Sequence, residues 1–562
     1  MKKNYLQIME QVVKCYTPEH IERYMADVVA NGLQEHGFTR VTVNLGILIA
    51  HGRKAEYKER FIEMMDLCCR EVPTCMLRNG ENVGNEFSVK ELVFCILEVE
   101  KAGILAPEYT RRWREELSKI KPFDTYCEVS EDPSVALCNW AAFGAASEQL
   151  RKYAGIGDES AFIDFQIHSQ LCSFDENGMY RDPHEPIVYD MVTRLQLAAA
   201  LYFGYEGDWK DALCENLEKS MDLTLLMQSV SGEIPYGGRS NQFLHNETFY
   251  AALCEYYASA LKKRGDLQKA GMFKRAARRA IESILPWLAE EKVSHIKNYY
   301  DIGTQYGCEF YAYYDKYMVT TASWLYMAYA MADDTIEEVA CPSEKDSFVW
   351  ETSEHFHKVF AKYGEYYAQW DTNADQEYES TGLGRIHKKN APSAICLSLP
   401  FTPTPVYELD MKNPSSLEIC GGVKGKEGYL HPCDGLGTYR VIDKEVTDAY
   451  VRVKCFFESE EKQQMWETCT ISSEGVVFEV EGDGDVEICF PVFEFDGKHH
   501  TEIFVQEKQV DVRYKGYCCS YTSDSEILLC DDVFANRNGH YRAASIRGEK
   551  YLALKITIDA CD

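Results

Sequence analysis

The sequence is poor in positive charge. Against 90 aspartates and glutamates stand only 59 lysines and arginines among 562 residues, which gives a formal net charge of −31. Proteins that bind nucleic acid neutralise phosphates with a basic face, and anionic membrane surfaces attract basic segments. The shortage of cations therefore excludes nucleic acid and membrane as expected partners. The simplest consequence expected of such a large net charge is that the protein is soluble.

Long apolar runs are also missing. No stretch approaches the roughly 18 apolar residues of a membrane-spanning helix, and Gln7, Glu10 and Gln11 interrupt the N-terminal segment where a signal peptide would be apolar. The 22 cysteines include no C-x-x-C pair, which disfavours metal knuckles and thioredoxin-like motifs. We interpret most of them as small buried hydrophobes and expect a cytoplasmic protein.

Two periodicities divide the chain. Up to about residue 335, apolar residues recur three or four positions apart, as Phe249, Leu253 and Tyr256 do, in about a dozen segments. This pattern predicts an (α/α) toroid of helical hairpins over 1–335, although spacing alone also permits a helical solenoid.

From residue 393 onward the period changes to two. Val451, Val453 and Cys455 alternate with charged residues, and turn signals such as Asp496-Gly497 separate the runs. We predict an antiparallel β-sandwich over 393–562. The segment 336–392 is expected to be a linker and part of the interface, with one helix near 351–367.

Four polar clusters are candidates for chemistry. The first is Asn139 beside Trp140 at the start of an apolar segment, where an N-cap is the simpler explanation for the amide. The second is a turn-rich loop that leads through His184 to Tyr189 in the first turn of a helix. Arg194 follows in the same helix and can also pair with Asp190 four residues before it.

The third cluster, 232–247, combines paired glycines with Arg239 and ends at His245, Asn246 and Glu247. Glycine pairs let the backbone approach a ligand closely, while a capping role for His245 and a helix-dipole role for Glu247 stay open. The fourth, 298–317, holds seven tyrosines in twenty residues. Aromatic faces edged with hydroxyl groups suit a sugar ring, although packing explains most of these side chains. Its candidate substrate-binding residues are Tyr300, Tyr306 and Tyr311.

The order of these clusters resembles that of the toroid-plus-sandwich polysaccharide lyases, the hyaluronate/chondroitin lyase and heparinase II/III groups. The shared features are Asn-Trp at 139–140, the Asn-Gly-Met-Tyr loop at 177–180 that leads to a His and a Tyr, and Gly-Arg-Ser at 238–240. The resemblance in architecture covers about residues 130–560. The resemblance in amino-acid sequence is limited to these short motifs. It also extends to toroidal uronic-acid hydrolases.

The resemblance implies β-elimination at a 4-linked uronic acid, and the expected cytoplasmic location favours short imported oligosaccharides as substrates. It makes Asn139 the group that neutralises the sugar carboxylate, Tyr189 the acid or base, and Arg239 the substrate clamp. His184 and Tyr189 are closer in sequence than in these lyases, so His245 competes for the role of the imidazole. His184, Arg194, Asn246 and Glu247 are further candidate substrate contacts.

Two other functions stay open at this point. A toroidal glucuronidase or unsaturated glucuronyl hydrolase would need paired carboxylates such as Asp190, Glu247 or Asp301, and a carbohydrate-binding protein would need no catalytic group. The lyase residues require no cofactor and no metal, while bound calcium is not excluded. Nothing in the sequence indicates the oligomeric state.

Overall fold

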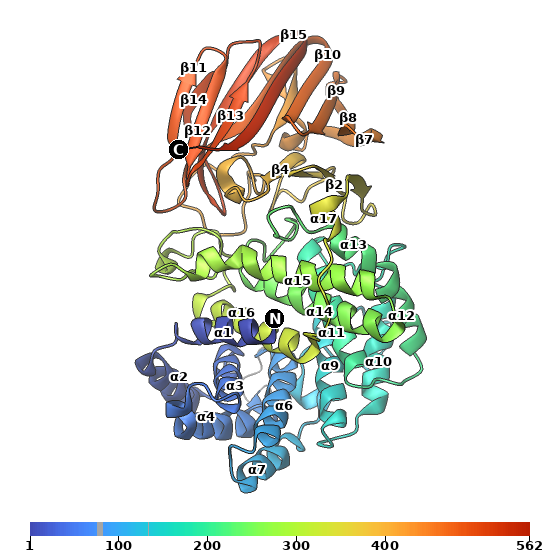
Figure 1. Cartoon of the computed structure of the whole chain (residues 1–562), viewed down its shortest axis with the longest axis vertical. Coiled ribbons are helices and arrows are strands. Elements are labelled where there is room, and N and C mark those ends of the chain that lie inside the picture. The colour runs from blue at the N-terminus through green and yellow to red at the C-terminus, as the bar shows by residue number, and fades with distance from the viewer. Residues whose placement is uncertain (76–82, 133, 562) are drawn as a thin grey trace.

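Six helices form a closed inner ring. The computed structural model describes residues 1–75, 83–132 and 134–561. Each inner helix packs against the next, and the last returns to the first. Closure of the ring confirms the toroid and excludes an open solenoid (Figure 1). The inner helices are α3 (Gly37–Ala50), α6 (Asn85–Ala102), α9 (Trp140–Tyr153), α11 (Ile187–Tyr202), α14 (His245–Arg264) and α16 (Tyr314–Met331).

An outer layer of helices covers this ring, one against each inner helix. Outer helices such as α15 bury one stripe and expose the other, whereas nearly all of α3 is buried because it has neighbours on every side. The outer helices are α1 (Lys2–Val13) on α16, α4 (Lys58–Glu71) on α3, α7 (Pro107–Leu117) on α6, α10 (Ser160–Leu171) on α9, α12 (Lys210–Lys219) on α11 and α15 (Leu267–Leu288) on α14. Shorter or peripheral helices are α2 (Pro18–Asn31), α8 (Pro122–Thr125), α13 (Met221–Leu226) and α17 (Pro342–Lys345).

A four-stranded antiparallel sheet lies between the toroid and the C-terminal strands (Figure 1). The predicted helix near 351–367 is therefore wrong. Phe360 and Tyr367 on this sheet join the toroid core, while Val359 and Ala368 join the core of the C-terminal domain. A strand buried on both faces has no period-two pattern, which explains the error. The strands are β1 (Phe348–Glu351), β2 (Lys358–Tyr363), β3 (Tyr366–Asp371) and β4 (Gly382–Lys388).

The remaining strands form the predicted antiparallel sandwich around one core. The long strands β10 and β15 pair with each other along most of their length, with a bulge between Glu481 and Asp485. The first part of β10 pairs with β9 and the later part with β5, so the two long strands contribute to both layers. The strands are β5 (Cys420–Lys424), β6 (Tyr429–Leu430), β7 (Gly437–Val446), β8 (Tyr450–Ser459), β9 (Gln464–Ser472), β10 (Gly475–Phe495), β11 (Glu502–Gln506), β12 (Gln509–Tyr514), β13 (Tyr517–Thr522), β14 (Leu528–Asn536) and β15 (Gly539–Ala560).

The cysteines are free thiols, and more than half of them are buried. Among the described residues, no helix has both the length and the apolar character needed to cross a membrane.

Candidate active site

A cavity of about 640 Å³ opens where the inner helices of the toroid begin. All six inner helices contribute lining residues from their first turns or from the residue just before the helix. A helix N-terminus carries a partial positive charge and unpaired backbone N–H groups. Six such ends around one cavity favour an anionic ligand there.

Aromatic side chains form one wall of the cavity. The ring of Phe87 lies edge-on to Trp140, with ring centres 4.8 Å apart, and to Phe143, with ring centres 4.5 Å apart. Phe249 and Trp324 extend this wall. Together they provide an apolar surface on which a sugar ring can stack.

Asp182 joins two of the predicted site residues. The Asn139 amide nitrogen donates a hydrogen bond of 3.0 Å to one Asp182 oxygen, and the Arg239 guanidinium forms an ion pair with the other. Asp182 is buried, and the guanidinium also lies 4.3 Å from the ring centre of Tyr189. A carboxylate in this position fixes the amide and the guanidinium side by side.

A chain of hydroxyl groups runs from Tyr189 to Tyr311 through Ser240. The Tyr189 and Tyr311 oxygens each lie 3.1 Å from Ser240 Oγ. Ser240 has a φ of 57°, in the left-handed region, and its backbone N–H donates to Glu309. Glu309 is itself held by a buried ion pair with Arg537, which lies between β14 and β15, with 2.8 Å between nitrogen and oxygen. The sandwich therefore helps to position the hydroxyl groups of the cavity.

His245 and Asn246, in the first turn of α14, present unpaired atoms. His245 Nδ1 and Asn246 Oδ1 are buried and have no hydrogen-bond partner within the described structure, whereas the Asn246 amide nitrogen donates to the Ser240 carbonyl over 3.0 Å. Burial, together with the nearby Arg40 charge, holds the pKa of His245 well below its usual range. The imidazole is thus neutral near pH 7 and can accept a proton or a hydrogen bond.

Residues that the sequence analysis did not single out also line the cavity: Glu35, His36 and Arg40 before and within α3, and Lys316 in α16. Arg40 pairs with buried Glu91 at 3.1 Å. Burial lowers the pKa of Lys316. The lysine and arginine side chains that line the cavity are therefore Arg40, Lys316 and Arg239.

Several predicted substrate contacts lie elsewhere. His184 is exposed and faces Asp375, 3.6 Å away. Arg194 is fully buried in an ion pair with Asp190, the pairing that the sequence left open. Tyr300 stacks on Tyr306 with 3.6 Å between ring centres, and neither lines the cavity.

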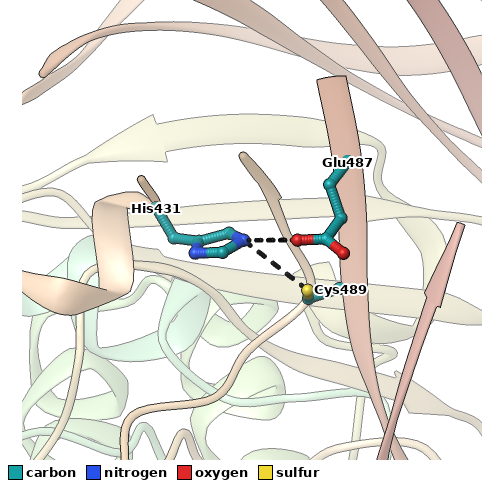
Figure 2. A group of neighbouring side chains, drawn as sticks. All are labelled: His431, Glu487 and Cys489. Carbon is teal, nitrogen blue, oxygen red and sulfur yellow. Dashed lines mark hydrogen bonds and ion pairs between the residues drawn. The ribbon is translucent and has the colours of Figure 1, made fainter. Parts of the chain in front are cut away.

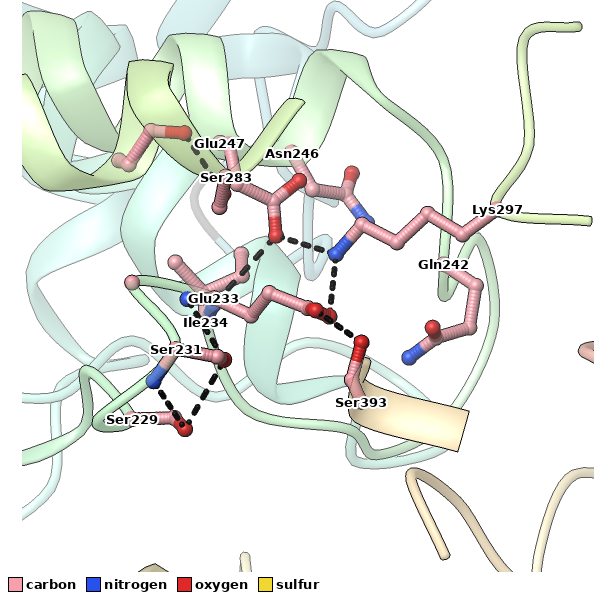
Figure 3. A network of polar contacts seen from close by, with 12 residues as sticks. Ser229, Ser231, Glu233, Ile234, Gln242, Asn246, Glu247, Ser283, Lys297 and Ser393 are labelled. Carbon is pink, nitrogen blue, oxygen red and sulfur yellow. Dashed lines mark hydrogen bonds and ion pairs between the residues drawn. The ribbon is translucent and has the colours of Figure 1, made fainter. Parts of the chain in front are cut away.

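Glu247 belongs to a buried ionic network behind the cavity (Figure 3). Lys297 Nζ lies 2.8 Å from a Glu233 oxygen and 2.6 Å from a Glu247 oxygen. Burial alone would raise the pKa of Glu233, but the Lys297 charge lowers it to about 2, whereas burial raises the pKa of Glu247. Ser393 donates to Glu233, so the network ties the 229–247 segment to the chain that leads into the sandwich.

Metal-ligating side chains gather outside the cavity. Within the described residues, three of them come close together only at His431, Glu487 and Cys489 in the sandwich. Calcium binding, which the sequence did not exclude, stays a prediction.

Comparison with known proteins gives matches of fold alone. No family model matches the chain, and no curated protein does. Among solved structures, the chain is similar to a mutant of the heparan sulfate lyase HepC from Pedobacter heparinus, with a TM-score of 0.47, 9% identity, and coverage of 93% of this chain and 77% of that one.

Two further solved structures cover different shares of the chain. A chondroitinase AC lyase gives a TM-score of 0.36 at 10% identity, covering 98% of this chain and 83% of that one. A family 88 glycosyl hydrolase from Bacteroides vulgatus gives 0.39 at 11% identity, covering 59% of this chain and 99% of that one. These are the lyase and hydrolase groups that the sequence resembles, and the chemistry of the cavity has to be argued from its own residues.

Proposed function

We propose that the protein is a lyase that cleaves a 4-linked uronic acid glycan by β-elimination in the toroid cavity. The observation that carries this proposal is that Asn139, Tyr189, Arg239 and His245 line one cavity, with an amide and a guanidinium held together by Asp182. The volume of the cavity is in the range of a site for a small ligand, which suits a short oligosaccharide.

Elimination breaks the C5–H and C4–O bonds and forms a C4–C5 double bond. Asn139 and Arg239, with the helix N-termini, would share the negative charge that develops on the carboxyl group as the C5 proton leaves. Neutral His245, which lines the cavity, is suited to accept that proton. The Tyr189 hydroxyl, held by Ser240, is suited to protonate the departing oxygen at C4.

Hydrolysis by paired carboxylates is less well supported. Among the described residues that line the cavity, Glu35 is the only carboxylate. Asp190 and Glu247 are occupied by buried ion pairs with Arg194 and Lys297, and Asp301 is an exposed residue that caps a short helix. A hydrolase needs two carboxyl groups that flank the scissile bond.

The direct test is incubation with a panel of uronate-containing oligosaccharides, followed by ultraviolet absorbance and product mass. A lyase gives an unsaturated, absorbing product, and the product masses add up to the substrate mass. A hydrolase gives saturated products whose masses include one added water. Binding of a panel member without turnover would favour the non-catalytic alternative, and hydrolysis would overturn the lyase proposal.

The acid side of the pH profile should identify His245 as the base. Because burial disfavours the imidazolium, His245 loses its acceptor only at a pH well below 6.5. We therefore expect kcat/KM, which reports the free enzyme, to stay constant as the pH falls to 6.5 and to decline only below it. NMR titration of the His245 ring in the free protein should give the same pKa. A decline centred at or above pH 6.5 would remove His245 as the base.

A further inference from the structure

The sandwich brings an imidazole, a carboxylate and a thiol together far from the toroid cavity in sequence and in fold (Figure 2). Glu487 and Cys489 are two residues apart on β10 and therefore point to the same face of the strand. Gly422 on β5 lies opposite Glu487. A Cβ atom at Gly422 would come 2.5 Å from His431 Nε2, so glycine leaves the space in which the imidazole lies.

The two distances from the His431 imidazole are close to the edges of a tetrahedral zinc site. His431 Nε2 lies 3.2 Å from Glu487 Oε2 and 3.6 Å from Cys489 Sγ. Zinc bonds of about 2.0–2.1 Å to nitrogen, 2.0–2.2 Å to oxygen and 2.3 Å to sulfur give tetrahedral edges of about 3.4 Å and 3.6 Å. The third pair, Glu487 and Cys489, lies within 4.8 Å, so one ion can contact all three atoms after the carboxylate and the thiol adjust to it.

Neighbouring groups already orient these atoms. Asp434 accepts from His431 Nδ1 over 3.3 Å, which leaves Nε2 to face Glu487 and Cys489. Arg547 Nε donates to the other Glu487 oxygen over 2.6 Å. Partners of this kind fix the tautomer and direction of metal ligands. A neutral imidazole, a carboxylate and a thiolate also carry two negative charges, which balance a divalent cation.

We propose that His431, Glu487 and Cys489 bind one zinc ion, with water as the fourth ligand. The thiolate and imidazole favour zinc over the oxygen-preferring calcium and magnesium. Cys489 and the Nε2 atom of His431 each release a proton to solvent when zinc binds. The ion would fasten the turn that contains η4 (Pro432–Asp434) to β10. The Cys433 carbonyl of this turn accepts from the Gln376 side chain over 3.3 Å, so the site braces the loop between β3 and β4 of the middle sheet.

The test uses the full-length, reduced protein and zinc itself. We expect one zinc per chain by elemental analysis after dialysis, and cobalt(II) in its place should give a thiolate-to-cobalt charge-transfer band. Cys489→Ser and His431→Gln should each weaken zinc binding by more than about 100-fold, and Asp434→Asn by about 10–100-fold. The control Cys530→Ser, which alters a thiol on β14 that contacts Asp532, should bind zinc like the wild type.

Three results would overturn the proposal. One is a wild-type protein that binds zinc no more tightly than the Cys489→Ser, His431→Gln double variant. Another is zinc binding that both single variants retain. The third, which needs no folded variant, is cobalt binding to the wild type without the charge-transfer band. In each case the cluster would be an imidazolium held between Asp434 and Glu487.

Discussion

Replacing Tyr189 with Phe should lower kcat on a cleaved uronate oligosaccharide by about 10²–10⁴-fold, which is the usual worth of one positioned acid or base. The substitution removes only the hydroxyl group, which lies 3.1 Å from Ser240 Oγ. The ring that packs beneath the Arg239 guanidinium is retained. Substrate affinity should therefore change far less than turnover. Initial rates measured from the ultraviolet absorbance of the product, over a range of substrate concentrations, separate kcat from KM.

Tyr313→Phe is the matched control for this experiment. Tyr313 lies two residues from Tyr311, is about half exposed and does not line the cavity. Its loss of a hydroxyl group should leave both kinetic constants unchanged. If Tyr189→Phe folds normally and keeps turnover within a few-fold of the wild type, another group protonates the leaving oxygen and the mechanism above is wrong.

Lys297→Met should destabilise the protein by about 3–5 kcal/mol, the range found when one partner of a buried ion pair is removed. Lys297 is 3% exposed and holds both Glu233 and Glu247. Without it, two buried carboxyl groups face each other and no cation compensates them. The change also releases the 229–247 segment, so activity should fall together with stability. Urea unfolding, followed by circular dichroism, measures the decrease in the free energy of unfolding.

Two variants make this experiment specific. Lys292→Met removes an exposed lysine, 3.7 Å from Asp301, and should leave the unfolding curve nearly unchanged. Adding Glu247→Gln to Lys297→Met replaces a buried charge with a neutral group and should recover part of the lost stability. An unfolding midpoint for Lys297→Met equal to that of the wild type would show that the network contributes little.

The sequence predicted those elements that have one buried and one exposed face. The outer helices and β8, with its alternating burial, show such periods clearly. Helix α3 has no polar stripe, because its neighbours bury it on almost every side, and no pattern singled out in the sequence falls on it. The helix predicted near 351–367, in the linker and interface segment, is wrong for the same reason. Periodicity reports contrast between two faces and is weakest where both faces are buried, although the largely buried α14 still shows it.

The candidate site was predictable to a similar degree. Polar side chains concentrated at helix starts pointed to Asn139, Tyr189, Arg239 and His245, which the structure places around one cavity. Glu35 and Arg40 were missed together with α3, since no local motif marks them. Asp182 lies in the turn-rich loop before His184, and only the fold shows that it holds Asn139 and Arg239.

The middle sheet has a consequence for how the chain can be divided. Phe360 and Tyr367 complete the core of the toroid, while their neighbours Val359 and Ala368 complete the core of the sandwich. A chain that ends after α16 would expose apolar core residues of the toroid. It would also lose Arg537, which forms the ion pair with Glu309 that positions the backbone of Ser240. The toroid is therefore not a transferable module. Any shuffling of this protein with another must carry the sandwich along with the cavity.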